Sequence, residues 1–271
     1  MTRRLPTLFL SHGSPMHAIE AGAAGRAWAT LGRALPQPRA VVMASAHWET
    51  SVPMLTGNPH PSTIHDFGGF PKELYELRYP APGAPEIAAR AVALLKDAGI
   101  TAGIDGCRGL DHGAWVPMMH LWPEHDVPVV QLSLQPDRGT SHHVALGRAL
   151  APLAGEGVLI VGSGHTTHNL RDWVAHRVNG GNTGGRREEP LRYAQEFTAW
   201  VQSTLDAGDV EALVDYRERA PHAERSHPTE EHFLPLHVAW GAAGERPRAE
   251  RVVTGYEAGA LALDSWLFQP A

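Results

Sequence analysis

Short runs of apolar residues alternate along the chain with longer segments in which apolar positions recur every three or four residues. The short runs are apolar at almost every position and are often flanked by glycine or proline, which is typical of strands covered on both faces of a sheet. We expect a buried strand at each of Thr7–Leu10, Ala40–Ala44, Ile100–Ile104, Val127–Leu134, Val158–Val161 and Arg251–Thr254.

The longer segments have the spacing of helices with one apolar face. Residues Pro85–Asp97 have proline in the first turn and are followed by Gly99, which are common signals of a helix start and end. Similar periodicity occurs at His142–Leu153, Leu191–Leu205 and Glu230–Trp240. Alternating strands and helices predict an α/β fold with a central, largely parallel or mixed sheet flanked by helices.

Two segments lack either pattern. Residues 51–83 are rich in proline, glycine and aromatic residues, and a loop of this length can cover a binding site. Residues 176–190 contain four glycines and are expected to be mobile or exposed. Helical periodicity resumes after each segment without a change in composition, so residues 1–271 are predicted to form a single domain.

Composition narrows the range of functions. The 271 residues are 43% hydrophobic and carry a net charge of -6, so no basic surface for nucleic acid is expected. The single cysteine, Cys107, excludes a disulfide framework and is expected to be buried. No window approaches the roughly 18 apolar residues of a membrane helix. The first apolar run is too short for a signal peptide. We therefore expect a cytoplasmic protein with no membrane partner.

Histidine is unusually frequent, with 17 residues, and several of them come soon after predicted strands. His12 and His47 follow the first two strands. His112 lies downstream of the third, and both His165 and His168 follow the fifth. A lone histidine after a strand is usually a turn residue. Because the carboxyl ends of parallel strands share one edge of a sheet, where α/β folds bind ligands, we expect several of these imidazoles to converge.

Converging neutral imidazoles can bind Zn, Fe, Cu or Ni. The pattern H-E-x-x-H is absent, so a metal site would have to be assembled from distant parts of the chain. His227, His232 and His237 recur every five residues, a spacing that rotates each one off the helix face of the previous one. At most one of these three is therefore expected to point to a shared centre.

A family resemblance rests on six motifs, which occur in this order: SHGSPMHAI (11–19), SAHWE (45–49), HDFGGFPKELYELRYPAPG (65–83), GLDHGAWVPM (109–118), GSGHTTHNL (162–170) and EEHFLPL (230–236). With these motifs the chain resembles the class III, LigB-type extradiol ring-cleaving dioxygenases, and most closely their DOPA 4,5-dioxygenase branch. The resemblance covers nearly the whole chain. It implies a single α/β domain that opens a catechol-type substrate with O2 at a non-haem metal centre.

The resemblance also implies roles for individual residues. His12, His47 and His232 match the metal-binding histidines of this branch. His168 matches the acid/base histidine, and His112 matches a second active-site histidine that faces substrate or oxygen. Fe(II) is the metal implied for the active form, and Zn(II) can occupy the same site.

Two alternatives remain open at this point. The wider superfamily uses two histidines and a carboxylate at iron, so Glu230 or Glu231, beside His232, could be the third ligand. An all-imidazole site also accepts zinc readily, and the alternative function is a zinc-dependent hydrolase using the same histidine cluster. A third possibility is a metal-dependent protein that binds a catechol without turnover.

The loop at 60–83 is expected to form the wall of the substrate pocket, although it could instead be a packed surface loop. Within it, His65, Phe67 and Tyr79 combine apolar surface with polar groups, the usual mixture in small-ligand sites. A catechol must lose protons to chelate a metal, and His168 is our candidate to accept one. His112 is expected to donate a hydrogen bond to the developing oxygen anion.

Overall fold

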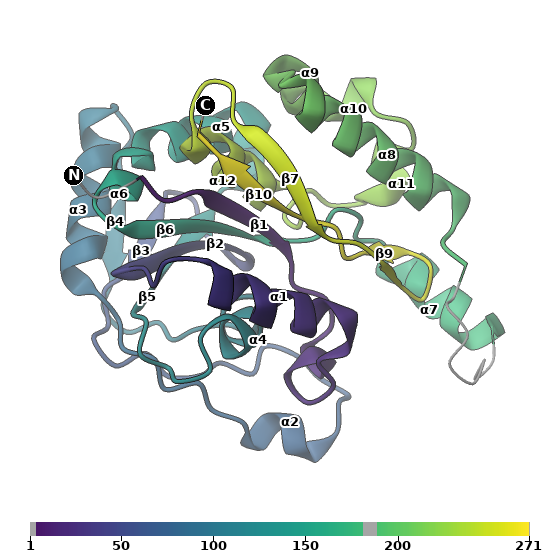
Figure 1. The fold of residues 1–271 in the computed structure, drawn as a ribbon, viewed down its shortest axis with the longest axis horizontal. Coiled ribbons are helices and arrows are strands. Elements are labelled where there is room, and N and C mark those ends of the chain that lie inside the picture. Colours follow the sequence, from purple (N-terminus) through teal and green to yellow (C-terminus); the bar gives the residue numbers. More distant parts are fainter. Residues whose placement is uncertain (1–3, 181–188, 271) are drawn as a thin grey trace.

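A mixed eight-stranded sheet runs through the centre of the molecule (Figure 1). The computed structural model describes residues 4–180 and 189–270. Across the sheet the strand order is β4-β3-β5-β2-β6-β1-β10-β7. These strands are β1 (Thr7–Ser11), β2 (Ala40–Glu49), β3 (Met54–Thr56), β4 (Gly103–Asp105), β5 (Val129–Leu134), β6 (Val158–Gly164), β7 (Arg248–Val253) and β10 (Ser265–Gln269). A small separate hairpin comprises β8 (Tyr256–Glu257) and β9 (Leu261–Ala262).

The four central strands β5, β2, β6 and β1 run parallel to one another. Antiparallel pairs flank them, because β10 pairs with β1 on one side and β3 pairs with β5 on the other. The prediction of an α/β fold with a largely parallel or mixed sheet is therefore confirmed. The carboxyl ends of β1, β2 and β6 lie at the same edge, which sets the position of the site described below.

Helices cover both faces of the sheet (Figure 1). They are α1 (Gly22–Ala34), α2 (Lys72–Glu76), α3 (Pro85–Asp97), α4 (His112–Leu121), α5 (Gly139–Leu150), α6 (Pro152–Gly155), α7 (Leu170–Gly180), α8 (Arg192–Ala207), α9 (Val210–Val214), α10 (Tyr216–Arg219), α11 (Ala223–Ser226) and α12 (Leu234–Ala243), with short 3-10 helices at Pro15–Ala18 and Pro136–Arg138. Within the described ranges, no helix has both the length and the apolar character needed to cross a membrane.

Successive residues of the central strands face two different cores. In β2, Val41 and Met43 pack in the core that contains α1 and α4. Val42 and Ala44 point the other way, into the core formed with α3, α5 and α12. Because both faces are covered, these strands are continuous apolar runs rather than alternating ones. Burying each large apolar side chain contributes on the order of 2 kcal/mol, so the two cores hold the helices firmly on the sheet.

The structure differs from the predicted elements at several boundaries. Strands β3 and β10 are not predicted, because β3 has three residues and the apolar run of β10 is equally short. Helix α4 is missed because it is apolar on almost every side and lacks helical periodicity. Helix α12 begins at Leu234 rather than Glu230, with Pro235 in its first turn, where proline is tolerated. The segment 176–190 was expected to be mobile or exposed. Its first residues, up to Gly180, form the end of α7, and residues 181–188 lie outside the described residues.

Cys107 corrects an expectation from composition. It is exposed to solvent rather than buried. The reason is its place in the turn after β4, which is the last strand at one edge of the sheet. The thiol therefore has no packing role in either core.

Two glycines near the end of β6 allow the first turn of α12 and the residues just before it to lie directly on the sheet. A Cβ atom on Gly162 would be 2.1 Å from the carbonyl oxygen of Pro235, and one on Gly164 would be 2.1 Å from that of His232. The amide of His165 donates a hydrogen bond to the same His232 carbonyl at 2.7 Å. These contacts place His232 beside the end of β6 although the two are distant in sequence.

We expect Gly162→Ala to destabilise the protein, because the added methyl group must push the backbone of Pro235 away from the sheet. Overpacking of this kind typically costs about 1–3 kcal/mol in the free energy of unfolding, which denaturant titration measures. Gly106→Ala is the control, since its Cβ would meet no atom within 4 Å. Equal stability of the two variants would contradict the close approach.

Candidate active site and metal centre

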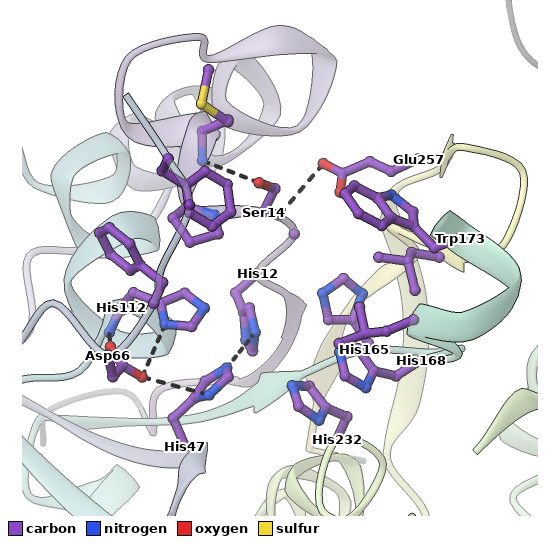
Figure 2. A pocket seen from close by; sticks show the side chains of 18 of the residues that line it. His12, Ser14, His47, Asp66, His112, His165, His168, Trp173, His232 and Glu257 are labelled. Atoms are coloured by element: carbon purple, nitrogen blue, oxygen red, sulfur yellow. Dashed lines mark hydrogen bonds and ion pairs between the residues drawn. The ribbon is translucent and has the colours of Figure 1, made fainter. Parts of the chain in front are cut away.

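A cavity of about 790 Å³ lies at the edge of the sheet where β1, β2 and β6 end. Figure 2 shows the histidine side chains that gather in it from separate parts of the chain. The histidines that line the cavity are His12, His47, His112, His165, His168 and His232. The structure thus brings together the five histidines predicted as metal ligands or catalytic groups, at the edge that the strand directions indicate.

His12, at the end of β1, has its ring oriented by a serine hydroxyl. Its Nδ1 lies 3.0 Å from Oγ of Ser163. That hydroxyl donates its own proton to the carbonyl oxygen of Gly113, so it accepts a hydrogen bond from Nδ1–H of His12. We therefore assign the Nδ1–H tautomer to His12, which leaves a lone pair on Nε2.

Carboxylates orient the other two predicted ligands in the same way. Nδ1 of His232 lies 2.8 Å from Oε1 of Glu231, and Nδ1 of His47 lies 3.5 Å from Oδ2 of Asp66. The carboxylate of Glu231 accepts a hydrogen bond from Nδ1–H of His232, and the nearby charge of Asp66 favours hydrogen on Nδ1 of His47. We therefore assign a lone pair to Nε2 of both rings. Nε2 of His232 is buried and has no hydrogen-bond partner in the part of the chain that the structure describes.

The three Nε2 lone pairs converge in a way that fits a metal ion. Ligand atoms of His12, His47 and His232 lie within 4.8 Å of one another, and Nε2 of His12 is 3.0 Å from Nε2 of His47. In the assigned tautomers no proton lies between those two nitrogens. Two nitrogens that bind the same ion at about 2.1 Å lie roughly 3.0 to 3.4 Å apart, from right-angled to tetrahedral geometry, so the observed spacing fits a shared ion.

Burial keeps these imidazoles in the neutral form that binds metals. Burial, reinforced by the neighbouring histidines, lowers the pKa of His12 and His232 well below the ordinary value. The same causes lower the pKa of His47 to about 3. Lone pairs on all three rings are therefore available at neutral pH.

Two further groups of three side chains also bring ligand atoms within 4.8 Å of one another. They are His47 with Asp66 and His112, and His168 with Glu231 and His232. In both groups the carboxylate already accepts hydrogen bonds from imidazole N–H groups. Glu231 is therefore better suited to orienting His232 than to replacing it as a ligand.

A buried polar network behind β2 positions His47. The carboxylate of Asp111 accepts hydrogen bonds from Ser45 and Gln131 at 2.7 and 2.6 Å. It also pairs with Arg108 at 3.1 Å. Arg108 donates a second hydrogen bond to the backbone carbonyl of His47 at 3.1 Å. Asp111, the aspartate of the GLDHG motif, therefore helps to position His47 by holding Arg108 against the backbone of that residue.

His112, the first residue of α4, is held by Asp66 from the 60–83 loop. Asp66 accepts from the backbone N–H of His112 at 2.9 Å and from its Nδ1–H at 3.0 Å. Burial alone would raise the pKa of Asp66, but the hydrogen bond and charge of His112 lower it to about 2. Because the ionised carboxylate of Asp66 accepts from Nδ1–H of His112, the Nε2 of this ring carries a lone pair.

His168 lies across the centre from His112 (Figure 2). Its ring stacks on that of His232 with centroids 3.4 Å apart. Burial, followed by the proximity of His165, lowers the pKa of His168 well below its ordinary value. His165 itself is buried in the lining, with its ring 4.9 Å from that of His12. Its position directly after β6 agrees with the expected convergence at this edge, although the sequence assigns His165 no role there.

The predicted substrate wall is only partly at the cavity. Phe67 lines it, but His65 and Tyr79 do not. Tyr79 is fully buried in a core, where its hydroxyl donates to the carbonyl of Trp122 at 3.0 Å. Nε2 of His65 lies 3.1 Å from the carbonyl of Leu77, and its ring packs against Phe67. The loop folds back on itself, so its aromatic residues divide between the cavity and the interior.

Of the three histidines spaced by five residues, His232 alone lines the cavity. His227 and His237 are buried elsewhere, with Nε2 of each directed at a backbone carbonyl oxygen at 2.8 and 3.0 Å. At most one of the three was expected at a shared centre, and this expectation holds, but not because of helix rotation. Only His237 lies in a helix, since His227 follows α11 and His232 precedes α12.

Comparisons with known proteins agree with the fold and the site. Residues 6–260 match the family described as the catalytic LigB subunit of aromatic ring-opening dioxygenase. The "4,5-DOPA dioxygenase extradiol" of Beta vulgaris is 42% identical over 266 residues, which cover 97% of this chain and 96% of that protein. The protein of the same name from Escherichia coli K12 is 40% identical, covering 96% and 93%. A crystal structure of an uncharacterized E. coli K12 protein, JW3007, aligns with a TM-score of 0.80 at 35% identity over 97% of this chain and 99% of the other.

The fold, the histidine-rich cavity and these matches define a metal-dependent enzyme that uses O2 to open aromatic rings. The chain belongs to the LigB family of extradiol ring-cleaving dioxygenases. The resemblance inferred from the six sequence motifs is thereby confirmed.

We expect the three converging imidazoles to bind a divalent metal ion, so alanine at His47 or His232 should reduce the metal content of purified, dialysed protein. Saturating metal should raise the unfolding free energy of the unsubstituted protein by about 2.7 kcal/mol at 100 times the Kd, and much less in the variants. His60→Ala at an exposed position is the control. Full metal occupancy in His232→Ala would contradict the assignment.

The ion pair between His17 and Glu257, of which Glu257 lines the cavity, generates a pH prediction. Burial alone would lower the pKa of His17 and raise that of Glu257, but their ion pair at 2.6 Å reverses both shifts. The raised pKa of His17 gives stability that is lost as pH rises above 6.5, and the lowered pKa of Glu257 gives stability that is lost as pH falls below 4.5.

The coupling free energy between His17 and Glu257 should therefore be largest between these limits. A double-mutant cycle with His17→Gln and Glu257→Gln, measured by denaturant unfolding, should give about 1–3 kcal/mol at pH 6 and clearly less at pH 9. A coupling that does not change with pH would show that the two side chains interact by packing rather than by charge.

Proposed function

We propose that this enzyme opens a DOPA-like catechol with O2 at an Fe(II) centre held by His12, His47 and His232. The observation that carries the proposal is the convergence of imidazole nitrogens of His12, His47 and His232, which lie within 4.8 Å of one another in a chain of the LigB family. Zn(II) is expected to bind the same nitrogens. We further infer that residues 1–271 act as one catalytic domain in the cytoplasm, a compartment that suits a lone exposed thiol at Cys107.

When bound, Fe(II) supplies open coordination positions and a change of oxidation state, whereas Zn(II) supplies only the former. The protein binds and orients the substrate. Phe67 and Phe70, whose rings are 5.4 Å apart, form an apolar wall of the cavity against which an aromatic ring can pack. This wall positions the two catechol hydroxyl groups toward the histidines.

His112 and His168 are our proposed proton-transfer groups, one on each side of the centre. Asp66 fixes the tautomer of His112, so its Nε2 can take a proton from a catechol hydroxyl. Only with that proton can Nε2–H donate the expected hydrogen bond to the developing oxygen anion, before the proton returns to an oxygen of the product. His168 is proposed for the same kind of role from its match to the family's acid/base histidine. Its ring, stacked on His232, lies next to the proposed ligands.

Protein loaded with Fe(II) without air, then mixed with L-DOPA and O2, should consume oxygen and form a coloured ring-opened product. Protein loaded with Zn(II) should consume none. We expect His112→Gln and His168→Gln each to lower kcat by about 100- to 10,000-fold. His60→Gln, at an exposed position outside the cavity lining, is the control.

Two outcomes would contradict the proposal. Iron-loaded protein that consumes no oxygen with any catechol would exclude ring cleavage by this centre. Ester or amide hydrolysis that proceeds without O2 and follows the zinc content would instead support the hydrolase alternative.

A further inference from the structure

Among the described residues, Glu257, in β8, is the one carboxylate of the cavity lining that does not hydrogen-bond to a histidine ring of the cluster. The other two, Asp66 and Glu231, accept hydrogen bonds from the rings of His112 and His232. Glu257 instead pairs through Oε1 with His17 at 2.6 Å. Its charge therefore lies apart from the proposed metal ligands while still facing the same cavity.

The second oxygen of this carboxylate has no partner. Oε2 of Glu257 is buried, and no described residue hydrogen-bonds to it. Oε1, by contrast, also lies 3.5 Å from the backbone amide of Ser14. A buried carboxylate oxygen without a donor is unfavourable in the free protein, so it marks a position where a bound N–H group would be stabilised.

Helix α7 adds an aromatic and a cationic group to the same lining. Leu170, Trp173 and Arg177 are spaced by three and four residues, which puts them on one face of the helix, and all three line the cavity. The guanidinium carbon of Arg177 lies 5.1 Å from the centroid of the Trp173 ring. In Figure 2, Trp173 and Glu257 lie away from His47, on the other side of His12.

We propose that Glu257 and Arg177 bind the charged side chain of the substrate, with its ammonium group at Glu257 and its carboxylate at Arg177. This inference rests on the proposed function, in which the catechol hydroxyl groups lie at the histidine centre. A substituent on the aromatic ring then extends toward α7 and β8. One free carboxylate oxygen and one guanidinium are complementary to the zwitterion of an amino acid, and Trp173 covers its alkyl part.

Four catechols separate the two charges. L-DOPA carries both charges, dopamine only the ammonium, dihydroxyphenylpropionate only the carboxylate, and methylcatechol neither. Each is measured for kcat/KM with the iron-loaded enzyme, and for Kd by calorimetry without O2. The value for methylcatechol is the reference for each variant, so that a general loss of activity cancels in the ratio.

Glu257→Gln should lower the ratio of dopamine to methylcatechol by about 10- to 100-fold, the loss expected for a hydrogen bond to a charged group. Arg177→Gln should lower the ratio of dihydroxyphenylpropionate to methylcatechol by a similar factor. L-DOPA should respond to both substitutions. The controls are Glu250→Gln, on β7, and Arg171→Gln, on α7, two exposed residues outside the lining.

Equal losses for all four catechols in Glu257→Gln would indicate a purely structural role and overturn the proposal. If Glu257→Gln lowers the dopamine ratio but Arg177→Gln leaves the dihydroxyphenylpropionate ratio unchanged, the assignment of both charges of a zwitterion would be overturned. If the unsubstituted protein opens no catechol, the proposed function fails, and the calorimetric ratios still test the binding of the two charges. Unchanged ratios in both variants would then overturn this inference as well.

Discussion

The site depends on an acceptor beside the Nδ1–H of each buried imidazole. With the proton held on Nδ1, the Nε2 of each ring presents its lone pair to a common point. Ser163 and Glu231 accept the Nδ1–H groups of His12 and His232, and the carboxylate of Asp66 lies 3.5 Å from Nδ1 of His47. Burial prevents these rings from becoming protonated. Without these acceptors, rings this close could hydrogen-bond to one another instead of coordinating an ion. The metal centre is therefore a property of the surrounding hydrogen bonds as much as of the histidines.

The packing of the fold brings these rings within reach of one another. Parallel central strands carry His12 and His47 to one edge of the sheet. The close approach of the segment before α12 at Gly164 adds His232 to them. Both cores lie directly behind this edge, so large apolar side chains resist movement of the strand ends. A rigid arrangement of this kind suits a site whose three histidines are proposed to hold one metal ion beside a substrate.

The two ends of the cavity differ in the way their charges are satisfied. At the histidine end, Asp66 and Glu231 each accept a hydrogen bond from an imidazole, so their charges orient the rings of His112 and His232. At the α7 end, Glu257 keeps a free oxygen and Arg177 faces the same space. Chemistry at one end and recognition of a substituent at the other is a division that a cavity of about 790 Å³ can accommodate.

The sequence by itself determined the α/β class, most central strands, the family and the residues proposed as ligands, because buried strands and short motifs are local patterns. It did not determine β3, β10 or α4, whose apolar runs are too short or lack periodicity. Only the tertiary structure decided that Tyr79 is in a core, that Cys107 is exposed and that Glu257 faces the cavity. The reason is physical: which way a loop side chain points depends on contacts between residues far apart in the chain.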